Sequence, residues 1–155
     1  MSEYSGNLKA FLDSTCEHLN RDWRSREGEI REHASKCERA ILATREVFGQ
    51  DHAFSRWRNG AFEGRFNRAV YDIMVFYFSD VTTAALAVSR HDAVVQGFKR
   101  LCDHDAEFAN ALQVTTKSIA ATHTRLARWG ESLSAAIGTQ MEIPRLEGSR
   151  IAYSI

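Results

Sequence analysis

The chain is organised around a strongly hydrophobic stretch, RFNRAVYDIMVFYFS at residues 65–79, in which ten of fifteen residues are apolar or aromatic. Four of these residues keep the spacing of one helix face: Phe66, Val70, Ile73 and Tyr77. Because other apolar residues cover the remaining faces, such a helix should be buried on several sides. The stretch is shorter than the roughly 20 apolar residues that cross a bilayer. We therefore predict that it forms the central helix of a soluble helical domain.

Two helical segments are predicted before this central helix. Residues 7–20 show helical spacing of apolar residues, with Asn7 as a candidate N-cap. The polar residues 21–27 form either a turn or a continuation of that helix. Residues 27–48 are predicted to be amphipathic, with a seam at Ile30, Ala34, Cys37, Ile41, Thr44 and Phe48. Gly49 follows directly and is placed to end the helix. Residues 50–64 are predicted to be a loop that folds back onto the core through Phe54, Trp57 and Phe62.

Four more helices are predicted after the central one, at residues 82–88, 91–102, 105–112 and from Thr115 or Thr116 to Ile137. Asp105 is placed to cap the third of these helices, and Gly138 is placed to stop the last. The helix at 91–102 should face inward through Val94, Val95, Phe98 and Leu101. The last helix should face inward through Ile119, Thr122 or His123, Leu126, Trp129, Leu133 and Ile137.

The C-terminal residues 139–155 differ from the helical part of the chain. They contain the only proline, Pro144, and end in the alternation Ile151, Tyr153 and Ile155. That pattern is typical of a loose end or of a strand that pairs with a partner. We therefore predict an all-α protein with one helical domain at residues 1–138 and an irregular C-terminal tail at residues 139–155. The domain should be a bundle of about five to seven helices around residues 65–79.

Composition narrows the classes of function. The chain carries 20 basic and 20 acidic residues, so its formal net charge is zero, which argues against a strong nonspecific grip on nucleic acid. The three cysteines are widely spaced and the N-terminus has no apolar signal core. These features predict reduced thiols and a cytoplasmic location. We expect no cofactor and no membrane segment.

Metal chemistry is not indicated. None of the six histidines has a glutamate three residues before it, as helical di-iron sites require. The dipeptides His91-Asp92 and His104-Asp105 resemble those of His-Asp metal phosphohydrolases. Both lie where helices should start, however, so Asp92 and Asp105 are more simply interpreted as helix caps.

RNA cleavage is an alternative, because helical ribonucleases of the HEPN type place an Arg a few residues before a His. Arg26 with His33 and Arg45 with His52 satisfy that spacing. The residue directly after each Arg is a glutamate, which fits the HEPN pattern poorly.

No nucleophile elbow and no phosphate-binding glycine loop occurs in the sequence. A basic cluster is the remaining candidate for contact with phosphate or with a partner: Arg56, Trp57, Arg58, Arg65 and Arg68. The competing interpretation is a solvated loop held in place by its aromatic residues.

The order of these signals resembles the C-terminal helical region of the GmrSD-type restriction family, over about residues 8–138. The resemblance rests on four segments: FLDSTCEHLN at 11–20, ILATREVFGQDHAFSRW at 41–57, FNRAVYDIMVFYFS at 66–79 and DAEFANALQVTTKSIAATHTRLARW at 105–129. The positions that match recurring family residues include Asn67, Asp72, Phe108, Thr116 and Arg125. The resemblance implies that Asn67, Asp72 and Arg125 form buried hydrogen bonds and ion pairs between helices.

The catalytic part of that family is missing. Its ParB/sulfiredoxin-like nucleotidase domain carries an Asp-Gly-Gln-Gln-Arg motif, which this chain lacks, as it lacks the His-Asn-His nuclease region of some members. No catalytic residue is therefore carried over. The resemblance implies a non-catalytic subunit or regulator of a modification-dependent restriction or anti-phage system, paired with a separately encoded ParB-like nucleotidase, with nucleic acid reached only through the complex. The alternatives are the HEPN-like ribonuclease and a stand-alone helical module that forms dimers or other homo-oligomers.

Overall fold

The first helix, α1, runs without interruption over the 41 residues Leu8–Phe48 in the computed structural model, which describes residues 8–113, 118–148 and 150–152. Of the two possibilities for residues 21–27, continuation of the helix is correct. Exposed ion pairs one turn apart support the helix here, including Arg26–Glu29 and Glu27–Arg31. Gly49 ends α1 as predicted, with a φ of +79° that glycine adopts without steric cost.

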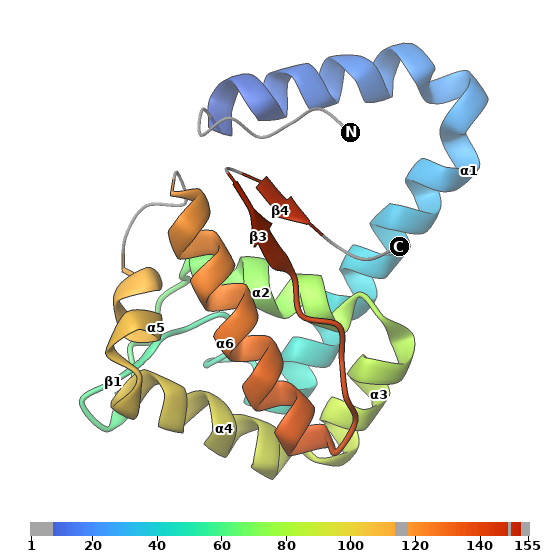
Figure 1. Cartoon of the computed structure of the whole chain (residues 1–155). Helices are drawn as coiled ribbons and strands as arrows, with labels where there is room; N and C mark the ends of the chain where they lie inside the picture. The colour runs from blue at the N-terminus through green and yellow to red at the C-terminus, as the bar shows by residue number, and fades with distance from the viewer. Residues whose placement is uncertain (1–7, 114–117, 149, 153–155) are drawn as a thin grey trace.

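The two limbs of α1 have different surroundings. Figure 1 shows a blue N-terminal limb across the top of the molecule and a cyan C-terminal limb that runs down against the other helices. Fully buried side chains of α1 begin only at Ala40. The predicted seam is therefore wrong at Ala34, which is exposed, because the buried face passes through Ala40, Thr44 and Val47.

Helix α2, Arg68–Phe78, is the central helix that the sequence predicts. It packs against α1, α3 (Val81–Ser89) and α6 (Ile119–Ile137). Its buried residues are Ala69, Val70, Ile73, Met74, Tyr77 and Phe78. The helix begins later than predicted because Asn67 is its N-cap and accepts a hydrogen bond from the Val70 amide at 3.0 Å. Phe66, which was predicted on the buried face, therefore precedes the helix and is 65% exposed.

Two further helices lie between α3 and α6, namely α4, His91–His104, and α5, Ala106–Ala111. Asp105 caps α5 as predicted, accepting a hydrogen bond from the Phe108 amide at 2.9 Å. The prediction that Asp92 is a cap is wrong, because it lies inside the first turn of α4, after the N-cap residue Arg90. There its carboxylate still complements the positive end of the helix dipole.

The last helix, α6, begins at a different cap from the one predicted. Ser118 is the N-cap, and its hydroxyl accepts a hydrogen bond from the Ala121 amide at 3.3 Å. The predicted caps Thr115 and Thr116 lie outside the described residues. Gly138 ends the helix with a φ of +65°, as predicted.

The centre of the core lies where α6 meets α4. The fully buried ring of Trp129 meets Phe98 edge-on, with 5.5 Å between ring centroids. Phe98 makes further edge contacts with Phe48 of α1 and Phe108 of α5. The buried face of α6 includes the predicted residues Leu126, Trp129, Leu133 and Ile137. One aromatic cluster thus joins four helices.

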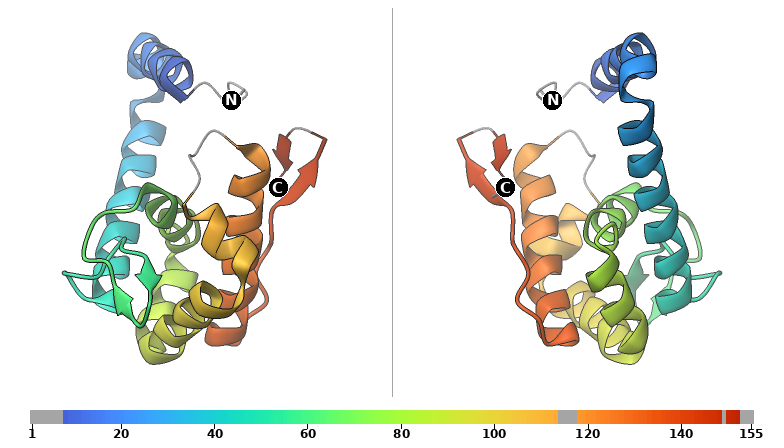
Figure 2. Two further views of the ribbon diagram at one scale, coloured as in Figure 1. Left: turned by 90° about the vertical axis from the view of Figure 1, so that its left-hand side faces the viewer. Right: turned by 90° about the vertical axis from the view of Figure 1, so that its right-hand side faces the viewer.

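Strands are confined to two short antiparallel hairpins in the described part of the chain. The first joins β1, Trp57–Arg58, to β2, Ala61–Phe62, and the second joins β3, Arg145–Glu147, to β4, Arg150–Ala152. Ile151, predicted to lie in a loose or partner-dependent end, instead pairs with Leu146 of its own chain. Tyr153 and Ile155 lie outside the described residues. Figure 2 shows this second hairpin at the edge of the bundle, away from the first.

The predicted fold class is confirmed: the described residues form an all-α bundle of six helices with an irregular C-terminal tail. Among them, no one helix has both the length and the hydrophobicity to cross a membrane, although the bent pair α2–α3 passes that test by length and composition alone.

Candidate functional site

The β1–β2 hairpin carries the first three residues of the predicted contact cluster. Its turn is formed by Asn59 and Gly60, whose φ values of +53° and +79° give the left-handed pair that a tight two-residue hairpin needs. This turn places Trp57 directly opposite Phe62, with ring centroids 5.1 Å apart. The segment 50–64 therefore folds back onto the core through its aromatic residues, as predicted.

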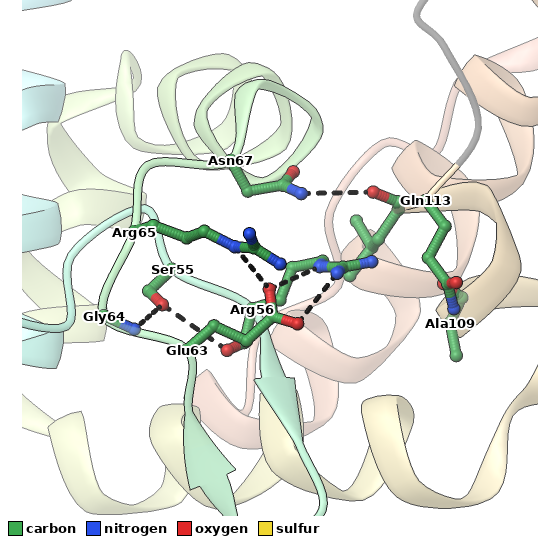
Figure 3. Close-up of polar contacts among 9 residues, drawn as sticks. Ser55, Arg56, Glu63, Gly64, Arg65, Asn67, Ala109 and Gln113 are labelled. Carbon is green, nitrogen blue, oxygen red and sulfur yellow. Dashed lines mark hydrogen bonds and ion pairs between the residues drawn. The ribbon is translucent and has the colours of Figure 1, made fainter.

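Arg56 is held by an acidic neighbour on the returning strand of the hairpin segment. Its guanidinium donates two hydrogen bonds to the carboxylate of Glu63, at 2.8 and 3.0 Å, and both side chains are largely buried. Arg65 reaches the same carboxylate at 3.6 Å but is 76% exposed, and Figure 3 shows both arginines directed at Glu63. Hydrogen bonds from Arg56 hold the pKa of Glu63 below its ordinary value. Arg56 is thus a structural cation rather than a vacant anion receptor.

Trp57 fixes the hairpin to α4. Its indole Nε1 donates to both carboxylate oxygens of Asp103, at 3.1 and 3.0 Å. Lys99 lies on α4 as Asp103 does, and its ammonium is 4.4 Å from the centre of the Trp57 ring. Neither Lys99 nor Asp103 was predicted from the sequence. The sequence signal for this arrangement is the Asn-Gly pair between Trp57 and Phe62. It predicts a hairpin whose aromatic residues must pack against another part of the chain.

A small pocket of about 280 Å³ opens beside this hairpin. Its walls are Arg56, Trp57, Arg58, Asn59, Cys102, Asp103, Ala109 and Gln113. Arg58 is exposed at its rim and is the cation there best placed to meet a partner. Burial raises the pKa of the Cys102 thiol to about 12, so this cysteine is not a nucleophile at neutral pH. The pocket suits polar contacts with another molecule rather than covalent chemistry.

The five residues of the predicted contact cluster do not form one patch. Arg56, Trp57 and Arg58 surround the pocket, and Arg65 lies beside Glu63. Arg68 is the first residue of α2 and its charge acts on Asp72 of that helix instead.

The residues singled out by the family resemblance lie between helices. Asn67 donates from Nδ2 to the Leu112 carbonyl at 3.2 Å, which joins the start of α2 to the end of α5 (Figure 3). Phe108 is fully buried beneath Phe98. Thr116 lies outside the described residues.

Asp72 and Arg125 join α2 to α6. Their side chains approach to 3.7 Å, and Arg125 is only 1% exposed. Arg125 also donates to the Thr122 hydroxyl at 2.9 Å. Burial raises the pKa of Asp72, while Arg125 and Arg68 oppose that rise. A pair of this kind orients helices against each other more than it adds net stability.

The HEPN-type pair Arg26 and His33 lies in a second hollow. A groove of about 680 Å³ follows one face of the N-terminal limb of α1. It is lined by Phe11, Thr15, His18, Leu19, Asp22, Arg26, Glu29 and His33. The guanidinium of Arg26 donates to both carboxylate oxygens of Glu29. Arg26 is thus paired with a carboxylate of its own helix.

The second HEPN-type pair is divided between a helix and a turn. Arg45 is exposed in the last turn of α1. His52 follows that helix and stacks on the ring of Phe62, with centroids 4.8 Å apart. His52 therefore helps to hold the β1–β2 hairpin.

Among the described residues, no three histidine, cysteine, aspartate or glutamate side chains gather closely enough to hold a metal ion. Comparisons with protein-family models, with curated proteins and with solved structures give no match to this chain.

Proposed function

We propose that the chain is a non-catalytic helical subunit of a modification-dependent restriction or anti-phage defence system, and that it pairs with a separately encoded ParB-like nucleotidase. The observation that carries this proposal is the position of the residues shared with the helical region of the GmrSD-type family. Asn67, Asp72, Phe108 and Arg125 all lie at contacts between helices. Segments that are distant in the sequence are thereby joined in one core, as in a complete helical half.

The β1–β2 hairpin is the surface that we assign to the catalytic partner. Arg58 is exposed on this hairpin and Arg65 is exposed shortly after it in the chain, while Arg56 and Trp57 are fixed by Glu63 and Asp103. Rigidly held aromatic and arginine side chains are the residue types enriched where proteins bind each other. Nucleic acid is then contacted by the assembled complex, consistent with the chain's formal charge of zero.

Co-expression with the adjacent gene product tests this proposal. Size-exclusion chromatography with light scattering should return a mixed complex, and nucleoside triphosphate hydrolysis should belong to the complex and not to the chain alone. Reversal of both exposed cations, Arg58→Glu with Arg65→Glu, should weaken the complex. Arg145→Glu is the matched control, because it changes an exposed cation of the other hairpin (Figure 2). Robust hydrolysis by the pure chain would exclude a non-catalytic subunit.

The groove favours one other candidate function, an RNA-cleaving activity of the HEPN type. Arg26 and His33 line the same groove, so the structure brings this predicted pair to one surface. RNA cleavage by the pure chain should then disappear on Arg26→Ala and on His33→Ala, and persist in Arg45→Ala. Absence of cleavage in the unmodified chain rejects this candidate.

A further inference from the structure

The N-terminal limb of α1 lacks a core of its own. No described side chain from Lys9 to Arg39 is fully buried, whereas the buried face of the same helix starts at Ala40. Leu12 and Trp23 are 44% and 39% exposed. Figure 2 shows this limb extending beyond the bundle in both views. Two large apolar side chains of this limb are therefore exposed to solvent.

Packing on α2 is already present at Cys37, whose sulfur lies 3.5 Å from the Tyr71 hydroxyl, so it is the part of the limb before Cys37 that gains little from the described residues of the bundle. In water, most helix stability in proteins comes from packing of an amphipathic face rather than from helix propensity. The residues that line the groove follow each other at three- and four-residue steps, from Phe11 through Asp22 to His33. Continuing those steps leads to Ala40, Thr44 and Val47, which are buried against the bundle. The groove therefore continues the packing face of α1 beyond the bundle.

Charge identifies the molecule that fits this face. Residues 9–39 contain seven basic and seven acidic residues, so the limb has no net charge with which to select nucleic acid or a strongly charged protein. Along the groove the ionisable residues alternate in type: His18, Asp22, Arg26, Glu29 and His33. A second copy of the limb that runs antiparallel, with its midpoint between Asp22 and Arg26, places acidic residues of one copy opposite basic residues of the other. In that arrangement Asp22 lies opposite Arg26, and His18 lies opposite Glu29.

We propose that the N-terminal limb of α1 is the contact surface for a second copy of this chain, with the two limbs antiparallel and Asp22 of each copy facing Arg26 of the other. Leu19 lines the same groove and supplies an apolar contact there. The ion pair between Arg26 and Glu29 does not compete strongly, because exposed pairs one turn apart are weak and a guanidinium has five donors. This contact is separate from the hairpin surface, so its success or failure is measured independently of the proposed catalytic partner.

Charge reversal at the two positions tests this arrangement. Light scattering and analytical ultracentrifugation of the full chain should show a dimer. Asp22→Arg alone and Arg26→Asp alone should each raise the dimer dissociation constant by about tenfold or more, because like charges then face each other. An equimolar mixture of the two variants should recover dimers, since each variant supplies the charge that the other lacks. The double variant should recover them as well.

Controls separate this contact from a general loss of helix. Glu17→Arg and Arg24→Asp make the same two charge reversals on the opposite face of the same limb and should leave the dissociation constant unchanged. Circular dichroism should show equal helix content in all variants. A chain that stays monomeric at about 100 µM overturns the proposal. So does a dimer indifferent to both reversals, or a mixture of the two variants that does not recover.

Discussion

Gly130 shows how one missing side chain permits the packing of α6 on α2. The Tyr77 hydroxyl donates to the Leu126 carbonyl at 2.9 Å, passing directly over Gly130. A β-carbon at that position would collide with the tyrosine hydroxyl and would lie 2.6 Å from Cδ1 of Ile143. Gly130→Ala should therefore reduce the free energy of unfolding by about 2 kcal/mol, the usual range for overpacking.

Gly28 supplies the matched control for this substitution. It also lies inside a helix, but a β-carbon there would meet nothing within 4 Å. Gly28→Ala should stabilise the chain by up to about 1 kcal/mol, because alanine has the higher helix propensity. Urea unfolding of both variants measures the difference. Equal effects at the two positions would show that helix propensity, and not the contact with Tyr77, governs Gly130.

Glu63 makes stability depend on pH in a definite direction. Its pKa in the folded chain lies below the ordinary glutamate value of 4.5, chiefly because Arg56 donates hydrogen bonds to it. Between the folded and unfolded pKa values the unfolded chain binds more protons, so stability rises with pH in that window. The contribution is complete above the ordinary pKa and is lost as the pH falls through the folded one. Glu63→Gln should cost about 2 kcal/mol at neutral pH, and progressively less in acid.

Asp72 should show the opposite dependence, because burial raises its pKa. Here the folded chain binds the proton more tightly, so stability is lost as the pH rises through the window between the unfolded and folded values. Asp72→Asn does not titrate. The stability of the unmodified chain relative to this variant should therefore increase as the pH is lowered, measured by urea unfolding at several pH values. The same trend for Glu63→Gln and Asp72→Asn would contradict the direction given for at least one of the two carboxylates.

The N-cap residues of α2 and α3 determine where these helices begin. They differ in whether the capping side chain also forms a hydrogen bond to another helix. Asn67 caps α2 and also donates to Leu112 of α5. Asp80 caps α3 through the Thr83 amide at 2.7 Å, and its side chain has no second hydrogen bond to the described part of the chain. Asn67→Ala should thus cost about 2 kcal/mol and Asp80→Ala about 1 kcal/mol. Thermal or urea unfolding of the two variants checks this order, and equal losses would mean that the bond to Leu112 contributes nothing.

The presence of the helices and the buried face of α6 could be predicted from the spacing of apolar residues. Two helix ends could be predicted from glycine positions. The inward residues of α6 and the stops at Gly49 and Gly138 follow from the sequence alone. Errors arose where a neighbouring element decides the outcome. Phe66 keeps helical spacing with α2, yet the helix begins only after its N-cap Asn67, which is also bonded to Leu112 of α5. The second hairpin was missed because β4 contains only Arg150–Ala152 and pairs with an equally short strand.

The candidate site was less predictable than the fold. The sequence marks Arg56 and Trp57 as a basic aromatic cluster, but their partners Glu63, Lys99 and Asp103 come from the returning strand segment and from α4. The folded arrangement of these segments decides which arginine is paired with a carboxylate. Charge alone therefore identified the region, while only the structure separates the held Arg56 from the exposed Arg58.

The whole chain combines a packed bundle with an uncovered helical limb, and hydrogen exchange can measure that contrast. At low concentration, amides of residues 9–39 should exchange faster than those of residues 40–48, because only the latter belong to the buried core. If two limbs pair, raising the concentration should slow exchange across residues 11–33 and leave the bundle unchanged. Asp22→Arg should abolish that concentration dependence, while Glu17→Arg should preserve it. Strong protection of the limb at every concentration would instead show that it is stable within a single chain, and pairing would then not be needed to order it.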